Sequence, residues 1–250
     1  MSSRQSFLQR TRLRELQEFL EGDIRASRGV GLDGIRPGDI PRPLDQRWND
    51  VCRHVQARLR DGRYDFTPYR ELLISKGRDR PPRVLSIPTI RDRLALKAAA
   101  VALRDVYGYS GPEIAQRKVG KLSGVTRSWG GFVRIDLKDY FGSIDHSALL
   151  GTLRPRVRSG VFREAVLAAL VNPTVEFGPK SVRVPNAKGI PQGLSISSVL
   201  AEIFLETFDD RWESDPSLKY FRYVDDIAVL CDRREAETIF ERLHSELADL

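Results

Sequence analysis

Two adjacent carboxylates, Asp225 and Asp226, separate two short apolar runs near the C-terminal end of this chain. The pattern predicts two strands, 220–224 and 227–231, with the acids at the turn between them. Neighbouring carboxylates repel each other and are costly to desolvate, so a fold that keeps them together needs water or cations around them. A solvent-exposed acidic turn is the alternative, although such a turn favours Gly or Asn beside the acids. The flanking residues therefore favour a cation site.

A third carboxylate, Asp136, ends another apolar run, residues 131–137, which we expect to form a buried strand. Three acids from two strand ends can hold two divalent ions about 3.5–4 Å apart, the arrangement used for in-line phosphoryl transfer. One Mg²⁺ would activate an attacking hydroxyl, and the other would stabilise a leaving pyrophosphate. The acids thus predict a site for two Mg²⁺ ions, with Mn²⁺ as a substitute.

The remaining pattern mixes helices and strands. Two further strands are expected at 69–74 and 83–87, on either side of a basic loop, and residues 185–193 must form a loop because they contain two prolines and two glycines. Apolar residues recur at helical spacing in seven segments: 7–26, 45–59, 89–107, 147–153, 161–171, a helix from 195, and a helix from 234 to the end. No linker or repeat interrupts the chain, so we expect one compact body with two sub-regions.

Composition leaves the partner open. The net charge is +7, and 33 of the 41 basic residues are arginine. An excess of arginine suits phosphate groups of a nucleic acid or nucleotide, but a GC-rich genome would give the same excess.

No run approaches the roughly 18 apolar residues of a membrane span, and the N-terminus lacks the apolar core of a signal peptide, so a cytoplasmic location without a membrane partner is expected. Two cysteines argue against a disulfide framework or a Cys-based zinc site, and no serine has visible His–Asp support for hydrolase chemistry.

Five blocks in a fixed order resemble the motifs of reverse transcriptases, especially group II intron and other bacterial enzymes. They correspond to a short motif before the fingers, the fingers motif, the first palm motif, the nucleotide-and-template loop and the Tyr-x-Asp-Asp box. In this sequence they are Gly31–Gly34, Arg83–Arg93, Phe132–Ile144, Gly189–Ser198 and Tyr223–Asp226. The resemblance covers residues 29–231, and the ordered set is far more specific than any single block.

The resemblance implies roles for the palm residues. Asp136, Asp225 and Asp226 would be the catalytic metal ligands, joined by the carbonyl of Leu137. Tyr223 and Val224 of the box would lie against the primer and template.

It also implies a nucleotide site. Phe141 would be the steric gate that excludes a ribose 2′-hydroxyl, with a role as a core aromatic as the alternative.

Lys76 and Arg83 would bind the triphosphate. The loop between them also carries Arg78 and Arg80 against one acid, Asp79, and a solvated basic loop is the alternative. Gln192 and Gly193 would contact the incoming nucleotide or the template. Arg91 and Arg93 fit salt bridges at a helix start equally well, and we expect Tyr140 to be a core residue.

The implied fold is an α+β right-hand polymerase fold limited to fingers and palm. Residues 1–130 would form a fingers-like region with an N-terminal helical extension and residues 131–250 the palm, the two interleaving so that 154–185 fits either. The chain ends 24 residues beyond Asp226, so the thumb is expected to be missing from it, through truncation or replacement by a partner. The segment 107–128 lacks the Gly-Phe-Arg-rich stretch of group II intron enzymes, which favours retron-like or antiviral-defence lineages.

The expected function is RNA-directed DNA polymerisation from dNTPs. The expected partners are an RNA template, such as a dedicated noncoding RNA, a DNA or protein primer, and a second copy or accessory subunit. Template-independent or protein-primed deoxynucleotide addition is an alternative that keeps the site. A non-catalytic RNA-binding scaffold is an alternative of another class, and it gives no physical reason to hold three carboxylates together.

Overall fold

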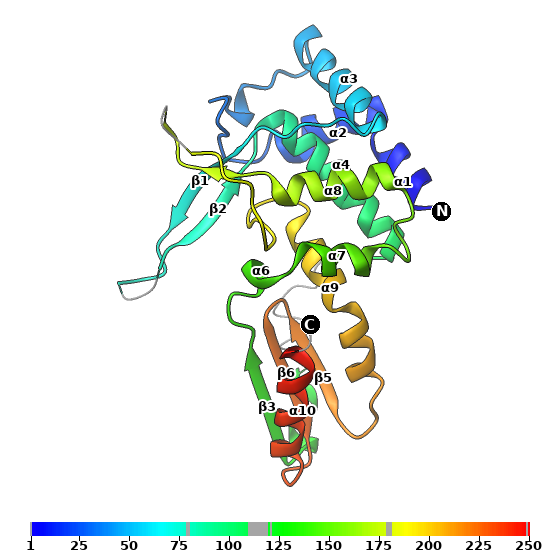
Figure 1. Cartoon of the computed structure of the whole chain (residues 1–250), viewed down its shortest axis with the longest axis vertical. Coiled ribbons are helices and arrows are strands. Elements are labelled where there is room, and N and C mark those ends of the chain that lie inside the picture. Colours follow the sequence, from blue (N-terminus) through cyan, green and yellow to red (C-terminus); the bar gives the residue numbers. More distant parts are fainter. Residues whose placement is uncertain (1, 79–80, 110–119, 121, 179–181, 249) are drawn as a thin grey trace. The chain divides into compact units, whose positions relative to one another are not determined.

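The computed structural model describes residues 2–78, 81–109, 120, 122–178, 182–248 and 250, and Figure 1 shows its ribbon. The chain forms two compact units, each assembled from two segments, where the sequence pattern predicted one body with two sub-regions. The first unit comprises Met1–Ser110 and Phe141–Leu200, and therefore includes residues 154–185, whose assignment the sequence left open. The second unit comprises Gly111–Tyr140 and Ala201–Leu250. The assignment of residues 1–130 to fingers and 131–250 to palm stays a prediction.

The first unit combines a small sheet with several helices. Its strands are ordered β2-β1-β4, with β2 antiparallel and β4 parallel to β1. Its elements are α1 (Ser3–Arg10), α2 (Leu13–Phe19), the π-helical η1 (Leu20–Ile24), the 3₁₀ turn η2 (Pro37–Asp39), α3 (Gln46–Arg60), β1 (Tyr69–Ile74), β2 (Arg83–Ile87), α4 (Ile90–Tyr107), α7 (His146–Leu153), α8 (Gly160–Val171) and β4 (Thr174–Val175).

Helix α4 lies at the centre of this unit because its sequence is apolar and small-sided around most of its circumference. Leu94, Leu96 and Leu103 are fully buried, together with most of its alanines, which allow α1 and α3 to pack closely against it. Thr89 caps its first turn, and Gly108 ends it in the left-handed conformation. This helix forms the core of the unit, on which α1, α2, α3 and α8 pack.

The second unit is an antiparallel sheet of order β3-β6-β5, joined by helices that lie beside it in Figure 1. Its elements are η3 (Thr126–Ser128), β3 (Gly131–Asp136), β5 (Lys219–Tyr223), β6 (Asp226–Cys231), α10 (Ala236–Ala248) and the larger part of α9 (Ser197–Glu213); the short helix α6 (Tyr140–Ser143) spans the boundary between the units.

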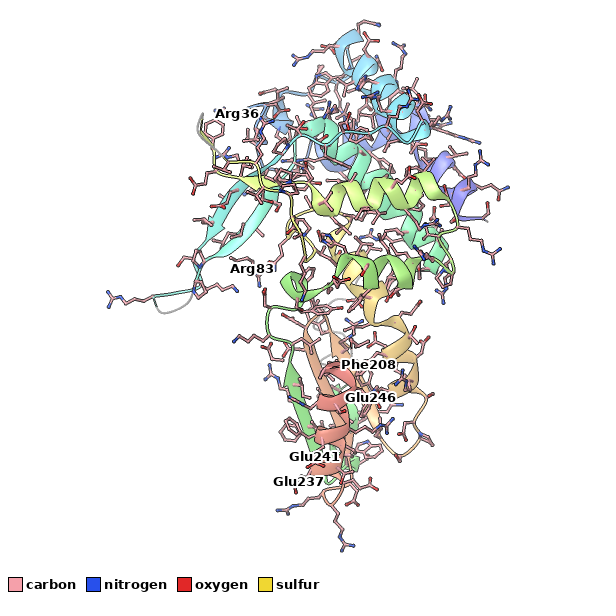
Figure 2. The ribbon with its side chains drawn as sticks, viewed as in Figure 1. Arg36, Arg83, Phe208, Glu237, Glu241 and Glu246 are labelled. Carbon is pink, nitrogen blue, oxygen red and sulfur yellow. The ribbon has the colours of Figure 1, made fainter. Side chains whose placement is uncertain are left out.

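One face of this second sheet is buried. Val133, Val229 and Tyr220 are nearly inaccessible, and the Tyr220 ring contacts Phe208 and Trp212 of α9. Figure 2 labels Phe208 on α9 and Glu246 on α10, whose carboxylate accepts a hydrogen bond of 3.0 Å from the indole of Trp212. The strand expected to be buried at 131–137 is therefore buried on one side only, and Phe132 on its other side is 70% exposed.

Candidate functional site

The three predicted catalytic acids lie at one end of the second sheet. Asp136, the last residue of β3, is the register partner of Asp226, the first residue of β6. The next backbone amide, that of Leu137, donates a hydrogen bond of 2.9 Å to the carbonyl oxygen of Asp225. Antiparallel pairing thus brings together acids that are about 90 residues apart in the sequence.

The acids Asp225 and Asp226 are presented by an unusual turn. Tyr223 pairs with Asp226, so the turn consists of Val224 and Asp225 alone. Val224 has a φ of 58°, a left-handed conformation that is unfavourable for a β-branched residue. Two-residue hairpins with a positive φ at the first central position normally have glycine there. The backbone at the acidic turn is therefore strained.

The carboxylate oxygens provide the hard donors that Mg²⁺ prefers, and the strand register fits a site shared by three acids. Among the described residues, however, no three His, Cys, Asp or Glu side chains converge closely enough to hold a metal ion. Asp226 instead accepts a hydrogen bond of 2.8 Å from the guanidinium of Arg134, and that bond raises the pKa of Arg134. The donor chemistry and the backbone positions fit a divalent cation, while the side chain of Asp226 is engaged elsewhere.

A buried arginine, which the sequence analysis did not single out, contacts the same turn. Arg222 of β5 donates to Asp209 and Glu202 of α9, and also donates a hydrogen bond of 2.9 Å to the carbonyl of Val224. Its place in an apolar strand, two residues from buried Tyr220 and hence on the same face, is the sequence feature that could have revealed it.

The predicted triphosphate residues belong to the first unit. Strand pairing of Ile74 with Arg83 closes the β1–β2 hairpin, and Lys76 follows in its loop. Both basic side chains are exposed, and within the described residues neither has an ion-pair or hydrogen-bond partner; Figure 2 labels Arg83 on the hairpin. Asp79 and Arg80 of the same loop lie outside the described residues.

The loop that carries Gln192 and Gly193 is attached to the hairpin. The amide of Ser86 on β2 donates a hydrogen bond of 2.7 Å to the carbonyl of Gln192. Gly193 has a φ of 101°, and a Cβ atom there would lie 2.9 Å from the carbonyl oxygen of Ser86. Glycine is therefore required at this position for conformation and for close approach.

Phe141 lies at the other end of the same loop. The amide of Ile190 donates a hydrogen bond of 2.7 Å to the carbonyl of Phe141, and a Cβ on Gly189 would lie 2.8 Å from the carbonyl oxygen of Gly142. The first unit thus links Phe141, the loop and β2 through backbone contacts. By contrast, Tyr140 is buried, and its hydroxyl bonds the Ala201 carbonyl, which confirms the expectation of a core residue.

Arg91 and Arg93 make structural contacts at the start of α4. Arg91 pairs with the fully buried Asp92, and Arg93 donates to Ser27 and to the carbonyl of Gly29. The predicted salt bridge at the helix start is confirmed for Arg91, whereas the hydrogen-bond partners of Arg93 are a hydroxyl and backbone carbonyls. Arg93 also faces a pocket of about 420 Å³ that Gly193 helps to line.

Comparisons with known proteins identify the family of this chain. The family model described as "Reverse transcriptase (RNA-dependent DNA polymerase)" matches residues 74–250. The chain is 27% identical to the group II intron-encoded protein LtrA of Lactococcus lactis subsp. cremoris over 90% of its own length and 36% of that protein. It is 25% identical to protein YkfC of Escherichia coli K12 over 83% of its length and 64% of that protein.

A third relative is the putative COX1/OXI3 intron 2 protein of Saccharomyces cerevisiae, which is 27% identical over 76% of the chain and 22% of that protein. The chain therefore spans less than two thirds of each of these relatives. Over the part of the chain that the structure describes, no helix has the length and apolar character needed to cross a membrane.

Proposed function

Since this chain belongs to the reverse transcriptase family, we propose that it is an RNA-directed DNA polymerase whose metal-dependent chemistry depends on Asp136, Asp225 and Asp226. The observation that carries the proposal is the strand register, which pairs Asp136 with Asp226 while the amide of Leu137 bonds the carbonyl of Asp225. A structural role gives no reason to place three carboxylates at the end of one sheet, because their mutual repulsion costs stability.

In this proposal the three aspartates and the carbonyl of Leu137 hold divalent ions, as members of the family generally do, and Mg²⁺ is the expected metal with Mn²⁺ as a substitute. When bound, two such ions supply activation of the priming 3′-hydroxyl and charge stabilisation of the leaving pyrophosphate. Asp226 must leave Arg134 to act as a ligand. Arg134 has a side chain 68% exposed, so its guanidinium can swing into solvent without losing packing.

The first unit would recognise the nucleotide. Lys76 and Arg83 are exposed cations without partners among the described residues, and so are available for triphosphate oxygens. Phe141 would pack under the sugar and exclude the 2′-hydroxyl, and Gln192 would contact the base or the template. Tyr223, which is 39% exposed, and Val224 would lie against the primer end.

The template, primer and biological role extend this proposal. The relatives named above are mainly intron-encoded proteins, which favours an RNA partner of group II intron type. The retron-like or antiviral-defence lineage expected from the sequence stays a prediction. So do the primer, whether DNA or protein, the second copy or accessory subunit, and the cytoplasmic location.

An extension assay tests the proposal. A primed RNA template is incubated with Mg²⁺ and either dNTPs or NTPs, with any copurifying RNA retained. We expect template-directed incorporation of dNTPs, and a loss of at least a hundredfold in Asp136→Asn and in the Asp225→Ala, Asp226→Ala double variant, because each removes metal ligands. Lys219→Met, an exposed change on β5, is the matched control.

Three other results would each change the assignment. Incorporation without a template would indicate an untemplated polymerase. Undiminished incorporation in the aspartate variants would place the chemistry elsewhere. Failure of the RNA-bound wild-type protein to incorporate any nucleotide, while it still binds RNA, would favour a non-catalytic scaffold.

A further inference from the structure

We propose that Arg222 is a positioning residue for the acidic turn: its buried guanidinium, anchored by two carboxylates of α9, fixes the carbonyl of Val224 and thereby the backbone that presents Asp225 and Asp226. The inference rests on the proposed function, because it concerns the same acids. It adds three residues that act at a distance from the substrate: Arg222, Asp209 and Glu202.

The contacts of Arg222 connect the helix to the turn. Its Nε donates a hydrogen bond of 2.8 Å to Asp209 Oδ1, its Nη2 donates one of 2.8 Å to Glu202 Oε2, and its Nη1 donates one of 2.9 Å to the carbonyl of Val224. The residue is only 6% exposed. The guanidinium is planar, and the bonds of Nε and Nη2 to the two carboxylates fix its orientation. Nη1 is therefore a fixed donor to the Val224 carbonyl.

The electrostatics keep this donor charged. Burial by itself lowers the pKa of Arg222, but the hydrogen bonds and charge of Asp209, together with the charge of Glu202, outweigh burial and raise it. The hydroxyl of Tyr220 donates a further bond of 2.7 Å to Asp209, which Arg222 also holds through both carboxylate oxygens. The cluster therefore has one cation between two partly buried anions, and removing the cation alone would leave both anions without that partner.

The turn requires such a restraint because its conformation is unfavourable. Val224 has a φ of 58°, and a two-residue turn with valine there would relax if its carbonyl were free to rotate. The Arg222 bond fixes this carbonyl, and the amide of Leu137 fixes the next one, that of Asp225. Two successive peptide groups are thus held, and the directions of the Asp225 and Asp226 side chains follow from them.

The test separates positioning from folding. The triple variant Arg222→Met, Asp209→Asn, Glu202→Gln removes all three charges together, so neither carboxylate is left without its cation, while the donor to Val224 is lost. The matched control, Tyr220→Phe, removes a hydrogen bond to the same Asp209 but leaves the Arg222–Val224 contact. The readouts are Mn²⁺ binding, followed by electron paramagnetic resonance without nucleotide, urea unfolding, and kcat and KM for dNTP.

We expect the triple variant to fold, to bind Mn²⁺ about tenfold more weakly and to lose kcat, with KM for dNTP changed less than twofold. Tyr220→Phe should lose stability but keep Mn²⁺ affinity within twofold. If the triple variant unfolds, Arg222→Lys serves instead: it keeps the charge but has one nitrogen in place of the three that bond Asp209, Glu202 and Val224. Weaker Mn²⁺ binding is again expected.

Wild-type Mn²⁺ affinity in a folded triple variant, or in Arg222→Lys, would overturn the inference. So would an equal loss of Mn²⁺ affinity in Tyr220→Phe, since it would show that general loosening of the cluster is responsible. If the wild-type protein itself neither binds Mn²⁺ nor incorporates dNTPs, the proposed function fails first.

Discussion

At the scale of single residues, the backbone of Val224 is strained by its positive φ. Its side chain stands at the tip of the acidic hairpin with φ at 58°, where only glycine is unstrained. Strain of this kind persists when neighbouring contacts hold it, here the bonds to the carbonyls of Val224 and Asp225. The turn conformation that presents Asp225 and Asp226 should therefore lower the stability of the folded protein at Val224.

Replacement of Val224 by Gly should stabilise the protein by about 1 kcal/mol. Relief of the left-handed conformation is worth ~1–2 kcal/mol, and the added freedom of glycine in the unfolded chain removes ~0.5–1 kcal/mol of that gain. Urea unfolding measures the change. Val224→Ala keeps a Cβ and should give no gain, so equal stabilisation by both variants would show that strain at φ is not the cause.

A second residue-scale prediction concerns Arg134, which holds the carboxylate of Asp226. Because a metal ion and the guanidinium compete for the same oxygens, Arg134→Gln should tighten Mn²⁺ binding, by about twofold for such an exposed pair. The effect should vanish in about 1 M salt, where the pair is already screened. Weaker Mn²⁺ binding in the variant would instead mean that Arg134 orients Asp226 toward the metal.

At the scale of elements, residues 189–193 depend on glycines for close backbone packing. Gly189→Ala should destabilise the first unit by about 3 kcal/mol, because φ is 87° and the new Cβ would lie 2.8 Å from the carbonyl oxygen of Gly142. Gly151→Ala is the control: its Cβ would enter open space within α7, and a gain of ~0.5–1 kcal/mol is expected. Thermal unfolding of both variants checks this, and a tolerated Gly189→Ala would show that the loop can shift.

Element prediction from the sequence succeeded where local pattern determines structure. The strands 69–74 and 83–87 appear with those bounds as β1 and β2, and the helix expected over 89–107 appears as α4. The helix expected over 7–26 is interrupted, since Arg12 adopts an extended conformation after Thr11, which caps α1 and whose buried hydroxyl bonds the Leu8 carbonyl. The apolar stripe continues across this break, so periodicity alone could not show it.

Some residues of the candidate site could likewise be predicted from local sequence pattern, and others could not. Asp136, Asp225 and Asp226 could be found from residue type and flanking strands, because strand ends and turns are local features. The contacts of Arg222 with Asp209 and Glu202 could not, because they depend on how α9 lies against β5. The strained turn at Val224 was equally hidden, since valine is a residue that sequence rules place inside strands.

At the scale of the whole molecule, the predicted functions are divided between the units. All three acids belong to the second unit, as do Arg134, which contacts Asp226, and Arg222, which contacts Val224. Lys76, Arg83, Phe141, Gln192 and Gly193 belong to the first unit. Substitutions in the first unit should therefore change KM for dNTP, and substitutions of the acids in the second unit should change Mn²⁺ affinity. The free-energy effects of the two kinds of substitution on binding should add.

Lys76→Met with Arg83→Met should raise KM for dNTP about tenfold, since two charge-assisted contacts to a triphosphate are lost. Mn²⁺ affinity and the unfolding midpoint should stay unchanged, because both side chains are exposed and have no partner among the described residues. Asp136→Asn should do the reverse, lowering Mn²⁺ affinity at least tenfold while the Kd for a primed RNA template changes less than twofold.

The salt dependence of RNA binding decides what the basic loop that carries Lys76 and Arg83 contacts. With a net charge of +7, RNA binding should weaken steeply as salt rises, and the Lys76→Met, Arg83→Met double variant should keep the wild-type slope. A slope that falls by about 2 with KM for dNTP unchanged would assign Lys76 and Arg83 to the nucleic-acid backbone instead of the triphosphate.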